Sequence, residues 1–167
     1  MSLTLIISCS VSQPKGEESS ETRLADMVLT DGRFTLYQKD ERPIVFTASR
    51  ASFYAADNSA EIDEIAFSQR DEDGELTLEG SADYGELNTE DKRLMLKGNV
   101  RLESMENGML IISEGPLFFD AESQEIETEA PSFVSSSDGE FSSSGFYGNL
   151  LNEEYSFSSL NSGRILI

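Results

Sequence analysis

A repeat of about thirty residues constrains this chain more than any other feature. In each unit an aromatic residue ends one alternating segment, a short acidic turn follows, and a new alternating segment begins. The aromatic residues are separated by 31, 35 and 28 residues, and the first apolar residues after the turns by 32, 32 and 29. Two short strands per unit predict an array of antiparallel hairpins. The positions are Phe53, Tyr84, Phe119 and Tyr147, followed by Ile62, Leu94, Ile126 and Tyr155.

Alternation of apolar and polar residues predicts strands along most of the chain after residue 30. Asp31-Gly32, the acidic segment 71–74 and Asn107-Gly108 are expected to be turns, the last of type I′. Roughly a dozen short strands at this spacing favour a sandwich, a jelly roll or a barrel. The expected segments are 27–37, 44–54, 62–69, 76–84, 94–103, 109–113, 117–119, 126–128, 132–135, 141–147, 155–160 and 164–167.

The same alternation predicts which side chains face the interior, because successive residues of a strand point to opposite faces. Met95, Ile111 and Phe118 fall on the nominal outer face, which indicates either a second packed layer or a lipid- or protein-facing patch. The outer face also receives Thr77 and Arg101. The residues expected to point inward in these strands are Leu76, Leu78, Leu94, Leu96, Val100, Leu102, Leu110, Ile112, Leu117 and Phe119.

The charge balance is strongly acidic, with 12 Lys and Arg against 32 Asp and Glu. Nucleic-acid binding needs clustered cations, so this function class is excluded. The acids indicate a soluble surface or, alternatively, a face that meets a basic partner or divalent cations. The apolar runs are too short for a transmembrane helix.

Catalytic and metal-binding patterns are missing from the sequence. The chain has no His and one Cys, so neither a Ser-His pair nor an intramolecular disulfide is available. The acidic segment 71–75 lacks the further ligand spacing of an EF-hand, which favours a hairpin turn. We therefore expect no enzyme, cofactor or metal site. A carbohydrate-active β-sandwich is the enzyme alternative, and a dominant carboxylate pair in a pocket would be needed to support it.

The first residues resemble a bacterial lipobox, since a short apolar run ends in Ile6-Ile7-Ser8-Cys9. In such a segment the cysteine is lipidated and becomes the mature N-terminus. The run is shorter than an ordinary signal peptide and has no basic n-region. We expect residues 1–26 to be a truncated lipoprotein-type anchor with a flexible tether, and residues 27–167 to be the folded domain.

Several segments resemble a known family in order and spacing. Ala82-Asp-Tyr84, followed after a polar turn by Leu94-Met-Leu-Lys-Gly-Asn-Val-Arg-Leu102, is similar to the signature of the lipopolysaccharide-export jelly rolls, LptC, LptA and their OstA-like relatives. The segment from Phe141 to Leu150 resembles the LptC branch in particular. The resemblance covers about residues 40–160 and implies an all-β, open twisted antiparallel jelly roll.

The resemblance also implies a function: a non-enzymatic periplasmic bridge protein that shelters acyl chains in an apolar trough. A lipidated Cys9, in place of the N-terminal transmembrane helix that is usual in LptC proteins, would hold it at the inner membrane. The partners implied are lipopolysaccharide or a related glycolipid, an LptA-like jelly roll at the C-terminal edge, and an LptB/LptF/LptG-type transporter at the N-terminal edge. The residues expected to face lipid are Phe46, Phe53, Ile62, Leu76, Leu78, Tyr84, Leu94, Leu96, Val100, Leu102, Leu110, Ile112, Leu117, Phe119, Ile126, Phe133, Phe141, Phe146, Tyr155 and Phe157.

The C-terminal segment Arg164, Ile165, Leu166 and Ile167 is the expected docking edge, with an ordinary closing strand as the alternative. Two other functions stay open: a scaffold jelly roll whose interior is simply packed, and an LptA-like soluble bridge subunit. The net charge of −20 would repel anionic head groups unless cations bridge them.

Overall fold

The computed structural model describes residues 23–37, 42–150 and 154–165, which form an all-β jelly roll. Eleven strands make one sheet, and the only helical element among the described residues is the 3-10 turn η1 (Ala55–Asp57). The expected fold class is confirmed. The strands are β1 (Met27–Leu36), β2 (Ile44–Tyr54), β3 (Ser59–Arg70), β4 (Leu76–Asn88), β5 (Arg93–Lys97), β6 (Val100–Ser104), β7 (Met109–Ser113), β8 (Leu117–Asp120), β9 (Glu125–Ser136), β10 (Gly139–Asn149) and β11 (Glu154–Ile165).

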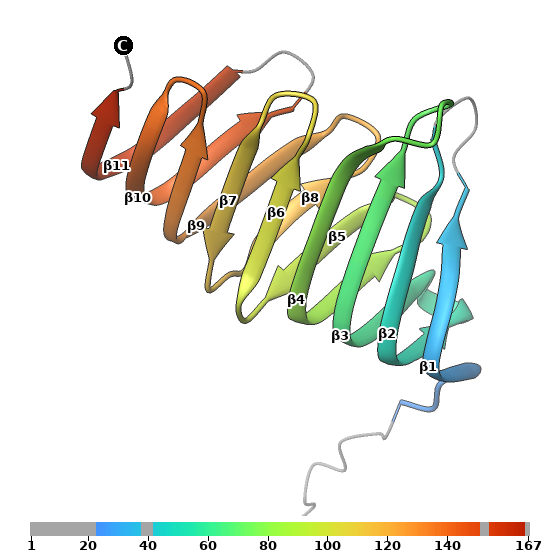
Figure 1. The fold of residues 1–167 in the computed structure, drawn as a ribbon. Helices are drawn as coiled ribbons and strands as arrows, with labels where there is room; N and C mark the ends of the chain where they lie inside the picture. The colour runs from blue at the N-terminus through green and yellow to red at the C-terminus, as the bar shows by residue number, and fades with distance from the viewer. Residues whose placement is uncertain (1–22, 38–41, 151–153, 166–167) are drawn as a thin grey trace, which may run out of the picture.

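The sheet is folded on itself into two layers (Figure 1). Its main path runs β1-β2-β3-β4-β5-β8-β9-β10-β11, with every neighbouring pair antiparallel. β4 pairs with β6 along its first half and with β5 along its second, while β9 pairs with β8 and then with β7. We call the half of the sheet that contains β6 and β7 the first layer, and the half that contains β5 and β8 the second.

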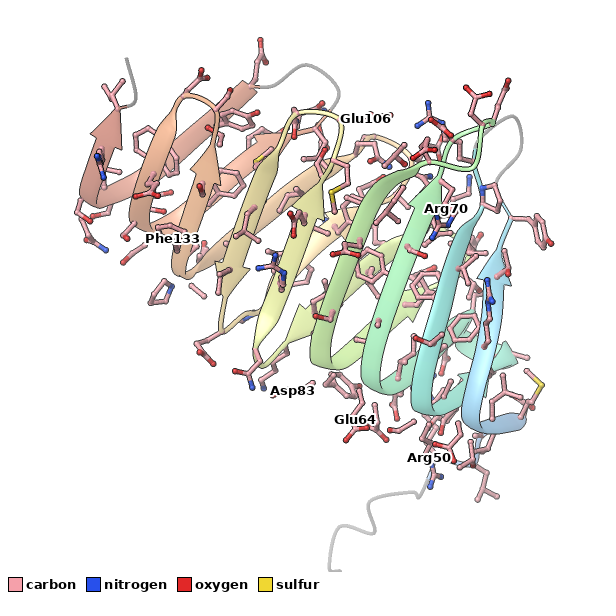
Figure 2. The ribbon with its side chains drawn as sticks, in the orientation of Figure 1. Arg50, Glu64, Arg70, Asp83, Glu106 and Phe133 are labelled. Atoms are coloured by element: carbon pink, nitrogen blue, oxygen red, sulfur yellow. The ribbon has the colours of Figure 1, made fainter. Side chains whose placement is uncertain are left out.

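Each long strand bends once and so contributes to both layers. Figure 2 shows Arg50, Glu64 and Asp83 along this line of bends, which we call the crease. Glu64 has a left-handed φ of 50°, and the β3–β4 pairing skips it. Backbone hydrogen bonds continue along the crease, from Asp83 N–H to Gly98 O (2.8 Å) and from Gly98 N–H to Glu114 O (2.9 Å). The layers are therefore continuous at the crease.

The bends explain the thirty-residue repeat. Turns 71–75, 105–108 and 137–138 lie at the edge of the first layer, and turns 55–58, 89–92 and 121–124 lie at the edge of the second. One repeat is thus a bent strand, a turn, a second bent strand running back, and a second turn. The two edges face each other opposite the crease, along a line that we call the seam.

Three expectations about local structure are corrected. Asp31-Gly32 is no hairpin turn: Asp31, with a φ of 48°, is the bend inside the continuous strand β1. Tyr84 lies inside β4, whose turn begins after Asn88. Segments expected to be separate strands, such as 126–128 and 132–135, are two halves of one bent strand. Conversely, segment 94–103 is divided at the crease turn Gly98-Asn99.

Candidate functional site

The space between the layers is lined by continuous apolar rows that cross every strand. Directly paired residues share a face, so each row can be followed from β1 to β11. The row in the first layer is Phe34, Phe46, Phe67, Gly80, Leu102, Ile111, Val134, Phe141 and Gly163. A facing row in the second layer is Leu29, Ala51, Ile62, Gly85, Leu96, Leu117, Thr128, Phe146 and Phe157.

The structure buries most of the residues that the sequence assigned to the interior. Those in the middle of the array are at most 2% exposed, which means that the two layers pack directly against each other. Five others are half-buried: Phe53, Leu76, Phe141, Tyr155 and Phe157. The fully buried ones are Phe46, Ile62, Leu78, Leu94, Leu96, Val100, Leu102, Leu117, Phe119, Ile126 and Phe146.

Three residues assigned to the interior lie instead on the outer face of the first layer. Ile112 is 42% exposed and pairs with Arg101 and Phe133, while Leu110 pairs with Glu103. Figure 2 shows Phe133 on β9, away from the seam. The inward residues of β7 are Met109 and Ile111, each 1% exposed. All of the first four residues of β7 are apolar, so alternation alone could not choose the buried face.

Tyr84 is the fourth residue assigned to the wrong face, and the bend explains why. Before the crease β4 buries Leu78 and Ala82, whereas after it the buried residues are Gly85 and Leu87. The alternation slips by one residue, so Tyr84 pairs with exposed Asp63 and Lys97. The same slip occurs in β2 and β3. Its sequence signal is a pair of residues between two inward ones, as in Ile62-Asp-Glu-Ile65.

Several interior residues were missed: Leu87 lies beyond the expected segment 76–84, Ile65 lies next to the bend at Glu64, and most of the others lie inside expected strand segments. Phe67 is the largest of them, and it forms a ring contact with Phe119 across the layers. The sequence signal that could have identified Phe67 is its position in the alternating run 65–69 of β3. The missed buried residues are Ile44, Ile65, Phe67, Leu87, Met109, Ile111 and Val134.

Most of the buried hydroxyl groups that the structure describes in the C-terminal half lie close to the crease, while Ser104, which is 4% exposed, lies at the seam end of β6. Ser132 and Ser143 are hydrogen-bonded to each other at 3.1 Å, and Thr128 donates to Pro116 O at 2.8 Å. Ser113 donates to Pro131 O at 3.2 Å. The hydroxyls close to the crease are thus satisfied within the protein and need no water between the layers.

The seam is polar. Arg42 and Glu106 form an ion pair of 2.7 Å, and this hydrogen bond raises the pKa of Arg42. Figure 2 shows Glu106 and Arg70 on this side of the molecule. A concave area here is lined by first-layer residues and by the second-layer segment that contains Ala121 and Gln124. Asn107 Nδ2 donates to Leu150 O at 3.5 Å, joining the two layers across the seam.

Carboxylates crowd the outer face of the second layer. Glu61 and Glu86 are direct cross-strand partners, an arrangement that is unfavourable for like charges. Burial first, and then Glu61 and Glu86, raise the pKa of Tyr84, which lies beside them. Within the described residues, no three acidic side chains are placed to hold a metal ion.

Both ends of the array are edge strands. β1 pairs only with β2 and β11 only with β10, so each leaves one side of its backbone unpaired by another described strand (Figure 1). Arg164 and Ile165 close β11, and Ile165 is 71% exposed. The remaining predicted edge residues, Leu166 and Ile167, and the predicted lipidation site, Cys9, lie outside the described residues.

The comparison with known families agrees with this geometry. The family model for lipopolysaccharide-assembly, LptC-related proteins matches residues 2–163, which is nearly the whole chain. The chain belongs to the LptC family. Membership in the LptC family implies a role in lipopolysaccharide transport. No curated protein matches the sequence. In the part of the chain that the structure describes, there is no helix with the length and apolarity needed to span a membrane.

Proposed function

We propose that this LptC-family chain is a non-enzymatic bridge in the periplasm. It shelters the acyl chains of lipopolysaccharide, or of a related glycolipid, between its two layers and passes the lipid along the array. The observation that carries the proposal is the pair of largely apolar rows that run from one edge strand to the other. A surface-bound lipid would not need a lining that continues through every strand.

The energetics favour acyl chains in this interior. Each methylene that leaves water for an apolar lining contributes about 0.8 kcal/mol. The outer faces carry acids such as Glu61 and Glu127, which stay in water and keep the molecule soluble. The saccharide then remains on the polar seam, while its chains lie between the layers.

The two edge strands supply the joints of the bridge. An unpaired strand edge is normally an aggregation hazard, but it also allows β-augmentation by a partner strand. We assign the β11 edge, including Arg164 and Ile165, to an LptA-like jelly roll. We assign the β1 edge to an inner-membrane transporter of the LptB/LptF/LptG type. Apolar side chains on the inner face continue to both edges, with Met27 at 49% and Leu160 at 55% exposed. Anchoring at the inner membrane through lipidated Cys9 is part of the same proposal.

Neighbouring aromatic residues on β10 provide a matched test. Phe146 faces the interior at 2% exposure, and Tyr147 faces outward at 42%. A photo-crosslinking benzophenone amino acid at position 146 should capture lipopolysaccharide, whereas the same amino acid at position 147 should not. Equal capture at both positions, or capture only at position 147, would contradict a lipid-bearing interior.

A packed scaffold is the second candidate, because the central side chains already fill the space between the layers. Native mass spectrometry of the purified protein separates the two functions. The bridge function predicts a glycolipid adduct after incubation with lipopolysaccharide, and the scaffold function predicts the mass of the protein alone. An LptA-like soluble subunit would bind lipid but would fractionate without the membrane.

A further inference from the structure

Aromatic rings bridge the two layers at three places among the described residues. At the N-terminal end Phe34 meets Phe53, with ring centroids 5.3 Å apart. At the C-terminal end Phe141 meets Phe157, also at 5.3 Å. Between them Phe67 of β3 stacks on Phe119 of β8 at 6.1 Å, with an interplanar angle of 14°. These bridges lie one after another along the array, with the rest of the core packed between them.

The central bridge differs from the end bridges in burial. All four rings of the end bridges are half-buried, so they border solvent and have room to turn aside. Phe67 is 3% exposed and Phe119 is 1% exposed. Neither central ring can move without displacing other core side chains, since interiors are close-packed.

A glycine seats the central bridge against the sheet. Phe67 pairs directly with Gly80, and a Cβ at position 80 would lie 2.3 Å from Cζ of Phe67. The ring therefore lies against the backbone of β4 and reaches Phe119 of the other layer. Together, the β4 backbone and the two rings occupy the cross-section of the interior at this point.

A route around the bridge is unfavourable on both sides. Toward the crease, Ile65, Leu96 and Leu117 are at most 1% exposed and fill the space. Toward the seam, a hydrocarbon chain would enter the polar concave area bordered by Arg42, Glu106 and other charged residues. Methylene groups in that area would regain contact with water.

We propose that the Phe67–Phe119 stack is the constriction of the trough, which an acyl chain must displace to pass from the β1 end to the β11 end. This inference rests on the proposed lipid-bearing interior. It makes these two rings determinants of passage, whereas the half-buried end bridges merely line the entrances.

A tethered acyl chain tests the constriction. In the full-length chain with Cys9→Ser, Met27→Cys places a thiol on the inner row at the N-terminal end. A maleimide-linked alkyl chain of about twenty carbons with a terminal diazirine is attached there, and it spans roughly five strand spacings of about 4.8 Å, enough to reach β7. After irradiation, labelled peptides are mapped by mass spectrometry following cleavage after glutamate. Trypsin is unsuitable because no Lys or Arg lies between Arg101 and Arg164.

In the unsubstituted interior, the label is expected on β1, β2 and β3, on the near side of the stack. Phe67→Leu should raise labelling of β6 and β7 roughly two- to tenfold, the order expected for loss of one aromatic pair. Phe119→Leu should do the same, and it keeps the test valid if one variant folds poorly. Thermal unfolding confirms that each variant is folded.

Phe46→Leu is the matched control. Phe46 lies in the same inner row at 1% exposure and contacts Phe34 and Phe67, all within the first layer. Equal labelling of β6 and β7 in Phe46→Leu and Phe67→Leu would overturn the constriction, as would labelling beyond the stack before any ring is changed. Absence of interior label in every variant would instead overturn the lipid-bearing interior itself.

Discussion

The centre and the ends of the array use the same alternating pattern for different purposes. In the centre, inward residues such as Leu96 and Phe119 are almost completely buried between neighbouring strands and the opposite layer. At the ends, residues that also face inward, such as Phe157 and Leu160, remain half-buried or exposed. The difference shows that an inward position is most fully buried where the sheet continues on both sides. Where the sheet stops, the same position keeps contact with solvent.

The largest expected difference between the centre and the ends follows from placing a carboxylate at an inward leucine of each region. Leu96→Asp buries an unpaired charge at a site with 0% exposure and should cost at least about 4 kcal/mol of unfolding free energy, so that little folded protein remains. Leu160→Asp, at 55% exposure, should change stability by about 0.5 kcal/mol or less. Denaturant unfolding monitored by circular dichroism measures both. Similar losses would mean that the terminal strands are as tightly packed as the centre.

Removing an aromatic ring should show the same contrast with a smaller effect. Phe119→Ala is expected to lower the unfolding free energy by about 3–5 kcal/mol, because it leaves a cavity between the layers. Phe157→Ala should cost only about 1–2 kcal/mol, since its half-buried ring is already partly in contact with water. Urea titration gives both values. A cost for Phe157→Ala that matches the central one would show that the C-terminal bridge is an integral part of the core.

A finer comparison is between a residue at the crease and a residue in an extended part of a strand. Glu64 has a φ of 50°, so Glu64→Gly should raise the unfolding free energy by about 0.5–1 kcal/mol through relief of backbone strain. Glu127→Gly, in an extended part of β9, should instead lower it by about 0.5–1 kcal/mol. Thermal unfolding at a fixed pH reports both changes. Destabilisation by Glu64→Gly would mean that the side chain matters more there than the bend.

The smallest expected effect is on stability at alkaline pH, and it concerns the tyrosines on the outer face. The pKa of Tyr84 is raised in the folded state. Its contribution to the free energy of unfolding is therefore complete below the ordinary tyrosine pKa of about 10, and it is lost as the pH rises through the pKa of the folded state. Tyr84→Phe should therefore flatten the decline in stability above about pH 10. The pKa of Tyr147 is raised by its hydrogen bond to Glu125, but this residue is 42% exposed, so Tyr147→Phe should flatten the decline less. Melting temperatures of both variants across this pH range show which substitution flattens the decline more.

Sequence patterns predicted the strands better than they predicted the faces. The boundaries of β2 and β7 agree with the expected segments, and Asn107-Gly108 does join β6 to β7. The four residues assigned to the wrong face fail for two physical reasons. Leu110, Ile112 and Phe133 each have an apolar neighbour in the strand that takes the buried position instead, so period two could not choose between the two faces there. Tyr84 follows a bend that shifts the alternation by one residue.

The all-β class, most of the turns and the period of the repeat follow from the sequence alone, because these depend on local propensities and on spacing along the chain. Only the tertiary structure decided that each strand bends at the crease, that Ile111 and not Ile112 faces the interior, and that Phe67 meets Phe119. Those outcomes depend on contacts between residues far apart in the chain. The way the sheet folds onto itself determines which rings come into contact between the layers, and no local sequence pattern encodes that contact.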